Sequence, residues 1–308
     1  MKKNNGAGKR IRTSDLLITN QLLYRLSYPS TFAEKKFHHS GQLKLFLKIN
    51  NSIFDIDEVL LPLLIAIMKK VKMNFDAVIW DYDGTLVDTS QKNFNVTRKI
   101  IEFVTDNPAE YYDCMKALDN YNAANSQAHN WRYLYKNFFH FSEDQIDMIG
   151  KLWTQFQLED NTEITFFPNL INVLKLSVQI PHGIVSQNSR QIILETLKDN
   201  DLDTYFQSII GYEEVDLQRQ KPHPEGLIRC IEDLGIQSGK IVYIGDHETD
   251  IRTAENAEIE FKKQKKNIEI STIAAYYGNH DDPALWKVKP DYIAHEIKDI
   301  ITILQKDE

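Results

Sequence analysis

Short apolar segments that alternate with helix-like segments are the feature of this 308-residue sequence that most restricts its fold. Each segment is brief and rich in β-favouring residues, as buried strands are. A succession of strand, helix and strand predicts parallel strands with helices on both faces, which is a doubly wound α/β domain. The predicted strands are 75–80, 183–186, 208–210, 241–244, 269–276 and 292–294, and the predicted helices are 168–176, 191–198, 224–234 and 250–257.

A second domain is expected after the first strand, because residues 88–163 contain no convincing strand. Aromatic and aliphatic residues recur there at helical spacing, which predicts a cap of about four helices. Residues 73–87 and 164–308 then form the core. The many aromatic side chains of the cap are interpreted as its own packing core rather than as a substrate cage. The helical stretches are 94–103, 111–118, 131–139 and 146–156.

The composition, with 42% hydrophobic and 26% charged residues, is that of a soluble globular protein. The two cysteines, Cys114 and Cys230, provide neither a disulfide framework nor a thiolate zinc site, so we expect a reducing, cytoplasmic location. The apolar run Val59–Met68 contains Pro62 and is shorter than the roughly 20 residues of a membrane span. We therefore expect no membrane and no nucleic-acid partner, and the sequence indicates no oligomeric state.

Positive charge is concentrated at the start of the chain. Residues 1–72 hold 13 Lys and Arg against 5 Asp and Glu, whereas the remainder holds 23 against 39. Within residues 1–67, the stretch Gly6–Tyr28 resembles a string found at the start of over-extended gene models, which is thought to arise from an upstream transfer-RNA gene. Our hypothesis is that residues 1–72 are a disordered or spurious extension and that the protein begins at Met73 or Met68. A disordered basic tail and a targeting arm are the alternatives.

Polar residues follow the first predicted strand at its carboxyl end, where ligands collect in sheets of this type. They are Asp81 and Asp83, followed by Gly84. Two carboxylates two positions apart would face opposite ways on a regular strand, but a sharp turn relieved by the glycine can bring both to one site. An Asp-rich surface turn is the alternative.

The second strand runs through Ser186, Gln187 and Asn188 into a helix. The hydroxyl and the free N–H groups of a helix start suit a phosphate group, although an ordinary N-cap explains the same residues. Further on, Lys221 lies in a turn that Pro222 and a second proline stiffen, which fixes a positive charge in place. A solvated loop lysine is the alternative.

A later strand ends in Asp246, and Asp250 follows one helical turn on. Both carboxylates can therefore face one hard cation. Mg²⁺ prefers one or two carboxylates together with waters and a substrate phosphate, so this spacing predicts a magnesium site. The neighbouring His247 and Glu248 are interpreted as polar loop residues rather than as ligands of a transition metal.

These four groups of residues together resemble the motifs of the haloacid dehalogenase-like superfamily, over about residues 74–300. The turn 81–88, Asp-Tyr-Asp-Gly-Thr-Leu-Val-Asp, and the turn 221–224, Lys-Pro-His-Pro, look like those of the phosphoglycolate phosphatase branch. The helical insert directly after the first motif is similar to that of members with a type 1 cap. The resemblance implies a Rossmann-like core that acts on a small phosphorylated metabolite with Mg²⁺.

Roles for individual residues also come from the resemblance. Asp81 would be the nucleophile that forms an aspartyl-phosphate, and Asp83 would be the general acid and then the general base. The carboxylates of Asp81 and Asp246 and the backbone carbonyl of Asp83 would hold Mg²⁺, with Asp250 bound directly or through water. The phosphate-binding residues would be Ser186, Gln187, Asn188 and Lys221.

The expected activity is hydrolysis of a small phosphate monoester. Phosphoglycolate is the substrate that the resemblance favours, and sugar phosphates and nucleoside monophosphates are left open. A phosphomutase acting on a sugar phosphate shares the core motifs and is one alternative. A non-catalytic scaffold with a basic binding arm is the other.

Overall fold

The protein is described here by a computed structural model, which places residues 33–37, 43–49, 52–56, 72–128, 130–279 and 282–305. The chain divides into two units, Met1–Lys72 and Met73–Glu308. The first unit contains an antiparallel sheet of three strands, β1 (Ala33–Phe37), β2 (Leu43–Ile49) and β3 (Ser52–Ile56).

The sequence-based prediction does not contain these three strands. Their signal is present in β2, where leucines at 43, 45 and 47 alternate with polar or bulky residues that include Lys44 and Lys48. Such alternation is the period of a strand, but here it extends over only 7 residues. The stretch Gly6–Tyr28 and Met68, on which the hypothesis of an over-extended start rests, lie outside the described residues.

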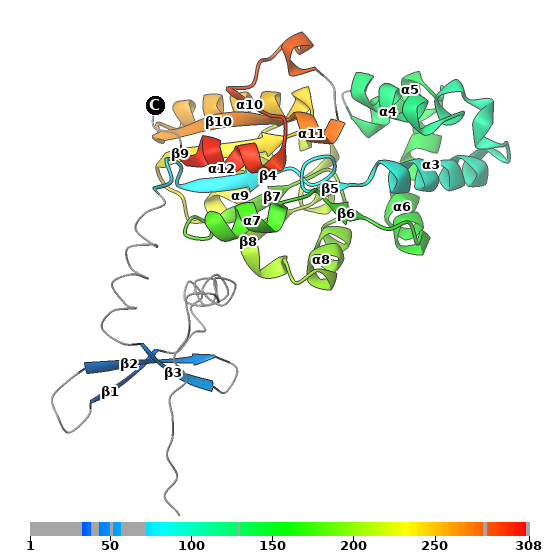
Figure 1. The fold of residues 1–308 in the computed structure, drawn as a ribbon. Coiled ribbons are helices and arrows are strands. Elements are labelled where there is room, and N and C mark those ends of the chain that lie inside the picture. The colour runs from blue at the N-terminus through cyan, green and yellow to red at the C-terminus, as the bar shows by residue number, and fades with distance from the viewer. Residues whose placement is uncertain are drawn as a thin grey trace, which may run out of the picture. The chain divides into compact units, whose positions relative to one another are not determined.

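The second unit is built on a parallel sheet of six strands in the order β11-β10-β9-β4-β7-β8 (Figure 1). The predicted doubly wound α/β fold is therefore confirmed. From β4 the chain builds β7 and β8 on one side of the sheet, and it then returns to build β9, β10 and β11 on the other side of β4. Sheets of this type bind ligands where the strand order reverses, which here is beside β4. The strands are β4 (Ala77–Trp80), β7 (His182–Val185), β8 (Phe206–Ile210), β9 (Gly239–Gly245), β10 (Ile268–Ala275) and β11 (Tyr292–Ala294).

Helices cover both faces of this sheet, with α7 and α12 in front of it and α10 behind it in Figure 1. On one face, Ile79 of β4 and Tyr243 of β9 pack in the same buried cluster as Leu227 of α9 and Phe261 of α10. This burial fixes the position of the two central strands. The core helices are α7 (Leu170–Leu176), α8 (Arg190–Asp199), α9 (Glu225–Asp233), α10 (Glu248–Lys263), α11 (Tyr276–Asn279) and α12 (Ile297–Gln305).

Between β4 and β7 the chain forms a helical insert with a core of its own, built largely from aromatic and aliphatic side chains such as Tyr135, Phe139 and Ile146. The interpretation of these aromatics as packing therefore holds for most of them. The prediction of a helix over 111–118 is wrong, because the chain there makes two short 3-10 turns and the next helix begins only at Leu118. The helices are α3 (Ser90–Thr105), α4 (Leu118–Gln127), α5 (Trp131–Asn137) and α6 (Glu143–Glu159).

A short antiparallel pair, β5 (Val87–Asp88) and β6 (Thr165–Phe166), joins the insert to the core. The strands of two residues each are too short to carry a periodic pattern. The helix α12 at the end of the chain is also absent from the prediction, although Ile297, Ile300 and Leu304 recur there at helical spacing and are buried. Among the helices of the described residues, none has the length and apolar character needed to cross a membrane.

Candidate active site

The loop after β4 carries the first two candidate residues and is held at the centre of the sheet. The Asp81 N–H donates to the carbonyl oxygen of Ile244 in β9 at 2.7 Å, which extends the strand pairing by one residue. Gly84 has a φ of +71°, and a Cβ at this position would lie only 2.1 Å from Asp246 Oδ2. Glycine therefore allows both the left-handed turn and the close approach of the loop to Asp246.

Three of the predicted metal ligands come together at this edge. The carboxylates of Asp81, Asp246 and Asp250 each present an oxygen within 4.8 Å of the others. Burial raises the pKa of Asp81 to about 7, although Lys221 opposes this rise. Burial, followed by the charges of Asp81 and Asp250, raises the pKa of Asp246 well above its usual value. Hard oxygen donors and an excess of negative charge are the conditions that fit Mg²⁺.

Lys221 reaches into the same cluster from the loop before α9. Its Nζ donates to Asp81 Oδ1 and to Asp250 Oδ1, both at 2.7 Å. Burial alone would lower its pKa, but the charges of Asp250 and Asp81 raise that pKa well above its usual value. The lysine is therefore a fixed cation with a third N–H available for a phosphate oxygen.

Asp250 is the most fully paired member of the cluster. Besides Lys221, the Tyr243 hydroxyl donates to its Oδ1 at 3.1 Å, and the His247 N–H donates to its Oδ2 at 3.2 Å. Tyr243 lies inside β9, where sequence reasoning treats it as a core residue. The geometry fits Asp250 as an anchor for Lys221 at least as well as a direct cation ligand.

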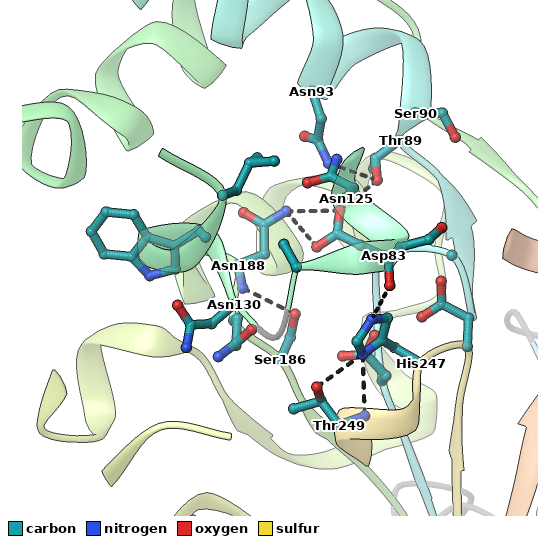
Figure 2. Close-up of a pocket in the computed structure, with 18 of the residues that line it drawn as sticks. Asp83, Thr89, Ser90, Asn93, Asn125, Asn130, Ser186, Asn188, His247 and Thr249 are labelled. Atoms are coloured by element: carbon teal, nitrogen blue, oxygen red, sulfur yellow. Dashed lines mark hydrogen bonds between the residues drawn. The ribbon is translucent and has the colours of Figure 1, made fainter. Parts of the chain in front are cut away.

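Asp83 has hydrogen-bond partners that the three-carboxylate cluster does not share. The Thr89 hydroxyl donates to Asp83 Oδ1 at 2.6 Å, and the Asn188 amide donates to both of its oxygens at 3.1 and 3.0 Å (Figure 2). Burial raises the pKa of Asp83, while these two hydrogen bonds lower it in part. In the structure Asn188 therefore binds Asp83, whereas the sequence analysis expects it to bind phosphate. Thr89 is a second partner of Asp83, and the sequence analysis does not include it.

The remaining candidate residues, Ser186 and Gln187, line the same pocket. The Ser186 hydroxyl accepts from the Asn188 N–H at 3.0 Å, so its own proton is available to a ligand. The Gln187 amide donates to the carbonyl of Lys221 at 3.3 Å and therefore links two walls of the site. All eight residues predicted from the sequence line one pocket.

Two contacts fasten the helical insert over this pocket. His247 Nδ1 accepts from the Thr249 N–H at 3.1 Å, so Nε2 carries the proton and donates to the carbonyl oxygen of Ser126 in α4 at 3.2 Å. The hydroxyls of Thr154 in α6 and Tyr212 in the core are 3.1 Å apart. The sequence gives no sign of either contact, because each joins residues far apart in the chain.

The pocket between the insert and the core has a volume of about 530 Å³. Figure 2 shows Asn93 and Asn125 on the side of the insert, facing Asp83 and Asn188 on the side of the core. Both domains therefore contribute to the walls, and the three clustered carboxylates belong to the core.

Comparison with known proteins decides the family. The sequence profile of the haloacid dehalogenase-like hydrolases matches residues 78–264, which is more than half of the chain. The chain is a haloacid dehalogenase-like hydrolase. The family and the enzyme class that the strand-end motifs predict are thereby confirmed.

Two relatives of this hydrolase are named as a pyrophosphatase and a phosphatase. It is 27% identical over 240 residues to the Pyrophosphatase PpaX of Oceanobacillus iheyensis, which covers 75% of this chain and 98% of that protein. It is 27% identical over 166 residues to the Phosphoglycolate phosphatase of Escherichia coli (strain K12), which covers 53% of this chain and 61% of that protein. The second match thus spans about three fifths of the relative.

Solved structures show the same fold. One is a predicted phosphoglycolate phosphatase from Haemophilus somnus, with a TM-score of 0.59 at 18% identity, covering 75% of this chain and 99% of that one. Another is a haloacid dehalogenase-like family hydrolase from Streptococcus pneumoniae, with a TM-score of 0.58 at 20% identity and the same coverage.

Proposed function

We propose that this hydrolase is a Mg²⁺-dependent phosphatase that cleaves a small phosphate monoester through an aspartyl-phosphate on Asp81. The observation that carries the proposal is the arrangement around Asp81, where a carboxylate cluster and a fixed lysine meet at the base of a pocket. The relatives named as phosphatases support it, and the two buried free cysteines agree with work in a reducing cytoplasm.

In the proposed first step, an Asp81 oxygen attacks phosphorus, and the bond from phosphorus to the ester oxygen breaks. Asp83 gives its proton to the departing alkoxide, so a neutral alcohol leaves. In the second step, water attacks the aspartyl-phosphate, Asp83 takes a proton from that water, and Asp81 is released with inorganic phosphate. Asp83 thus regains from water the proton that it gave to the alkoxide, and both carboxyls return to their starting state.

The environments of the two carboxyls suit these roles. Asp83 accepts hydrogen bonds from Thr89 and Asn188 rather than from Lys221, and its burial favours the protonated form that a general acid needs. Burial raises the pKa of Asp81 to about 7, and the paired Lys221 opposes this rise and so favours the ionised form that a nucleophile needs.

Asp81, Asp246 and Asp250 are the residues that would hold Mg²⁺, which when bound offsets the repulsion between carboxylate and phosphate. Lys221 and Ser186 would bind the oxygens of the transferred phosphoryl group, where charge gathers in the transition state. The N–H of Lys221 that remains after its two carboxylate contacts is suited to this task.

Replacement of the nucleophile tests the proposal. In Asp81→Asn the carboxylate oxygen that attacks phosphorus is lost, so phosphate release with Mg²⁺ should fall by about a thousandfold or more. Phosphate release from p-nitrophenyl phosphate, before and after treatment with EDTA, is the measurement.

Asp119→Asn is the matched control, because Asp119 is exposed on α4 and does not line the pocket. It should retain full activity. Persistent turnover in Asp81→Asn, or an activity indifferent to EDTA and added Mg²⁺, contradicts the proposal. Product analysis with a sugar phosphate separates hydrolysis from isomerisation by a mutase.

A further inference from the structure

We infer that the pocket accepts phosphate monoesters whose leaving group is an uncharged, ring-bearing alcohol of about the size of a nucleoside. The inference rests on the proposed phosphatase function and specifies its substrate class. It excludes as preferred substrates esters whose leaving group carries a second anionic group, such as phosphoglycolate and pyrophosphate. Three features of the pocket support it: its charge, its aromatic wall and its row of amides.

The charge of the pocket is the first feature. Among the described residues that line it, Lys221 is the sole Lys or Arg, and its ammonium group is committed to Asp81 and Asp250 at the phosphate end. Both ring nitrogens of His247 are engaged within the protein, since Nδ1 accepts the Thr249 N–H and Nε2 lies 3.2 Å from the carbonyl oxygen of Ser126. No described cation therefore faces the part of the cavity where the leaving group lies.

One cationic side chain of the insert, Arg132, lies beside the pocket, with its guanidinium 5.2 Å from the centroid of the Trp131 ring. It donates to Asp147 at 2.7 Å and to Glu143 at 2.8 Å, so its charge is paired with two carboxylates. A carboxylate or a second phosphate on the leaving group would lose water beside Asp83 and Asp88 and gain no counter-charge. Burial of an unpaired charge is strongly unfavourable, so anionic leaving groups are selected against.

An aromatic wall is the second feature. Trp131, Tyr135 and Trp153 line the cavity, and Trp131 and Trp153 are only partly covered by the protein. The Trp131 indole lies against Gly150 of α6, where an added Cβ would come within 2.8 Å of its Cη2. It also meets Tyr135 edge-on at 6.3 Å between ring centroids. The Arg132 guanidinium covers one side of the ring, 5.2 Å from its centroid. The indole is thus held in place, and its face away from Arg132 is the flat surface on which a planar ring can pack.

A row of side-chain amides is the third feature. Asn122 and Asn125 lie one helical turn apart on α4, and both line the pocket. The Asn130 Oδ1 accepts the Tyr133 N–H at 2.9 Å as the N-cap of α5, which leaves its NH₂ group to a ligand. Amides donate and accept without charge, so they suit the hydroxyls and ring heteroatoms of a neutral group.

The size of the cavity agrees with this assignment. About 530 Å³ lies within the range of pockets that enclose drug-sized ligands, whereas the two-carbon leaving group of phosphoglycolate would leave most of it empty. A nucleoside provides a planar base for the aromatic wall, hydroxyls for the amides and no charge.

A substrate panel with the full-length protein and Mg²⁺ tests the inference. The panel contains nucleoside 5′-monophosphates, ribose 5-phosphate, phosphoglycolate, pyrophosphate and p-nitrophenyl phosphate. We expect the best nucleoside monophosphate to exceed phosphoglycolate and pyrophosphate in kcat/KM by at least about tenfold, since uncompensated like charge is costly. Ribose 5-phosphate, which lacks the base, should fall below it.

The outcomes separate this inference from the proposed function. Turnover of p-nitrophenyl phosphate with a preference for phosphoglycolate or pyrophosphate overturns the inference and leaves the phosphatase proposal intact. If ribose 5-phosphate has the same kcat/KM as every nucleotide, the claim that the aromatic wall binds a base is overturned. Absence of turnover with every ester, p-nitrophenyl phosphate included, overturns both.

Two substitutions probe the wall directly. Asn122→Lys places a cation in the pocket and should shift the kcat/KM ratio of phosphoglycolate to nucleotide upward by about tenfold. Gln127→Lys is the matched control, because Gln127 lies exposed on the same helix outside the pocket, and it should leave the ratio unchanged. An unchanged ratio in a folded Asn122→Lys protein overturns the charge argument.

Trp131→Ala removes the flat surface. It should raise KM for nucleoside monophosphates by about tenfold and leave inhibition by inorganic phosphate unaltered, since phosphate does not reach the wall. Equal effects on both ligands would indicate a general loss of structure and would count against the aromatic wall.

Discussion

At the scale of single residues, the partly buried Asp83 is distinguished from the buried Asp81 by its hydrogen-bond donors. Thr89 and Asn188 donate to its carboxylate, while Lys221 donates to Asp81. Thr89 is the N-cap residue of α3, yet its hydroxyl makes no cap hydrogen bond and is given to Asp83 instead. The start of the insert is therefore tied directly to the proposed general acid, which makes Thr89 a positioning residue.

Thr89→Val keeps the shape of the side chain and removes this donor. We expect kcat to fall about tenfold with little change in KM, because the acid loses its orientation but the phosphate site stays intact. The hydrogen bond from Thr89 lowers the pKa of Asp83, so its loss should raise that pKa. Asp83 acts first as a protonated acid, so the alkaline limb of the pH–rate profile should move to higher pH.

Thr105→Val provides the control, because the Thr105 hydroxyl donates to the carbonyl of Ile101 at the far end of the same helix. It should alter neither kcat nor the pH profile. A Thr89→Val enzyme with reduced kcat but an unmoved alkaline limb would argue for a structural rather than a positioning role.

At the scale of secondary-structure elements, the pairing of β4 with β7 contains a buried histidine. The Trp80 indole N–H donates to His182 Nδ1 at 3.0 Å, so the proton of the neutral ring is on Nε2, beside Ser177. Burial lowers the pKa of His182 to about 4. The folded protein thus keeps a neutral imidazole at the beginning of the strand that leads to Ser186.

Acidification should therefore lower the free energy of unfolding through this histidine. Between pH 6.5 and 4 the unfolded chain binds a proton at this histidine and the folded chain does not, so stability falls as pH falls. Linkage gives a loss of about 2 kcal/mol at pH 5 relative to neutral pH. Above pH 6.5 both states are neutral, and the histidine adds no pH dependence.

Urea unfolding of the protein and of His182→Gln at neutral pH and at pH 5 provides the measurement. The buried carboxyls with raised pKa, such as Asp81, act in the opposite direction, so the difference between the two proteins isolates the histidine. His182→Gln should be less stable at neutral pH but should lose less on acidification. The same loss in both proteins would contradict the assignment.

Much of this element scale is predictable from the sequence, because β4, β7 and β9 are apolar runs that end in polar residues. The convergence of Asp81, Asp246 and Lys221 follows from the parallel sheet, since the carboxyl ends of its strands share one edge. What the sequence cannot provide is the direction of each side chain after its strand ends. The hydrogen bond from Asn188 to Asp83 joins residues 105 positions apart, and the one from Tyr243 to Asp250 joins residues 7 positions apart. No local sequence pattern encodes either contact.

At the scale of the whole molecule, every residue of the proposed site lies in the unit Met73–Glu308, and so do both walls of the pocket. None of the described residues of the site belongs to the basic segment 1–72.

A chain that begins at Met73 should therefore keep its activity. We expect kcat/KM with p-nitrophenyl phosphate within about twofold of the full chain and a thermal midpoint within about 3 °C, because a unit with its own core folds independently. A chain that begins at Asp81 is the control, since it lacks β4 between β9 and β7 and should not fold. Loss of activity on starting at Met73, in a protein that remains folded, would assign the arm a part in function. Retention of activity would place binding, catalysis and the choice of leaving group in the unit that contains the sheet and its helical insert.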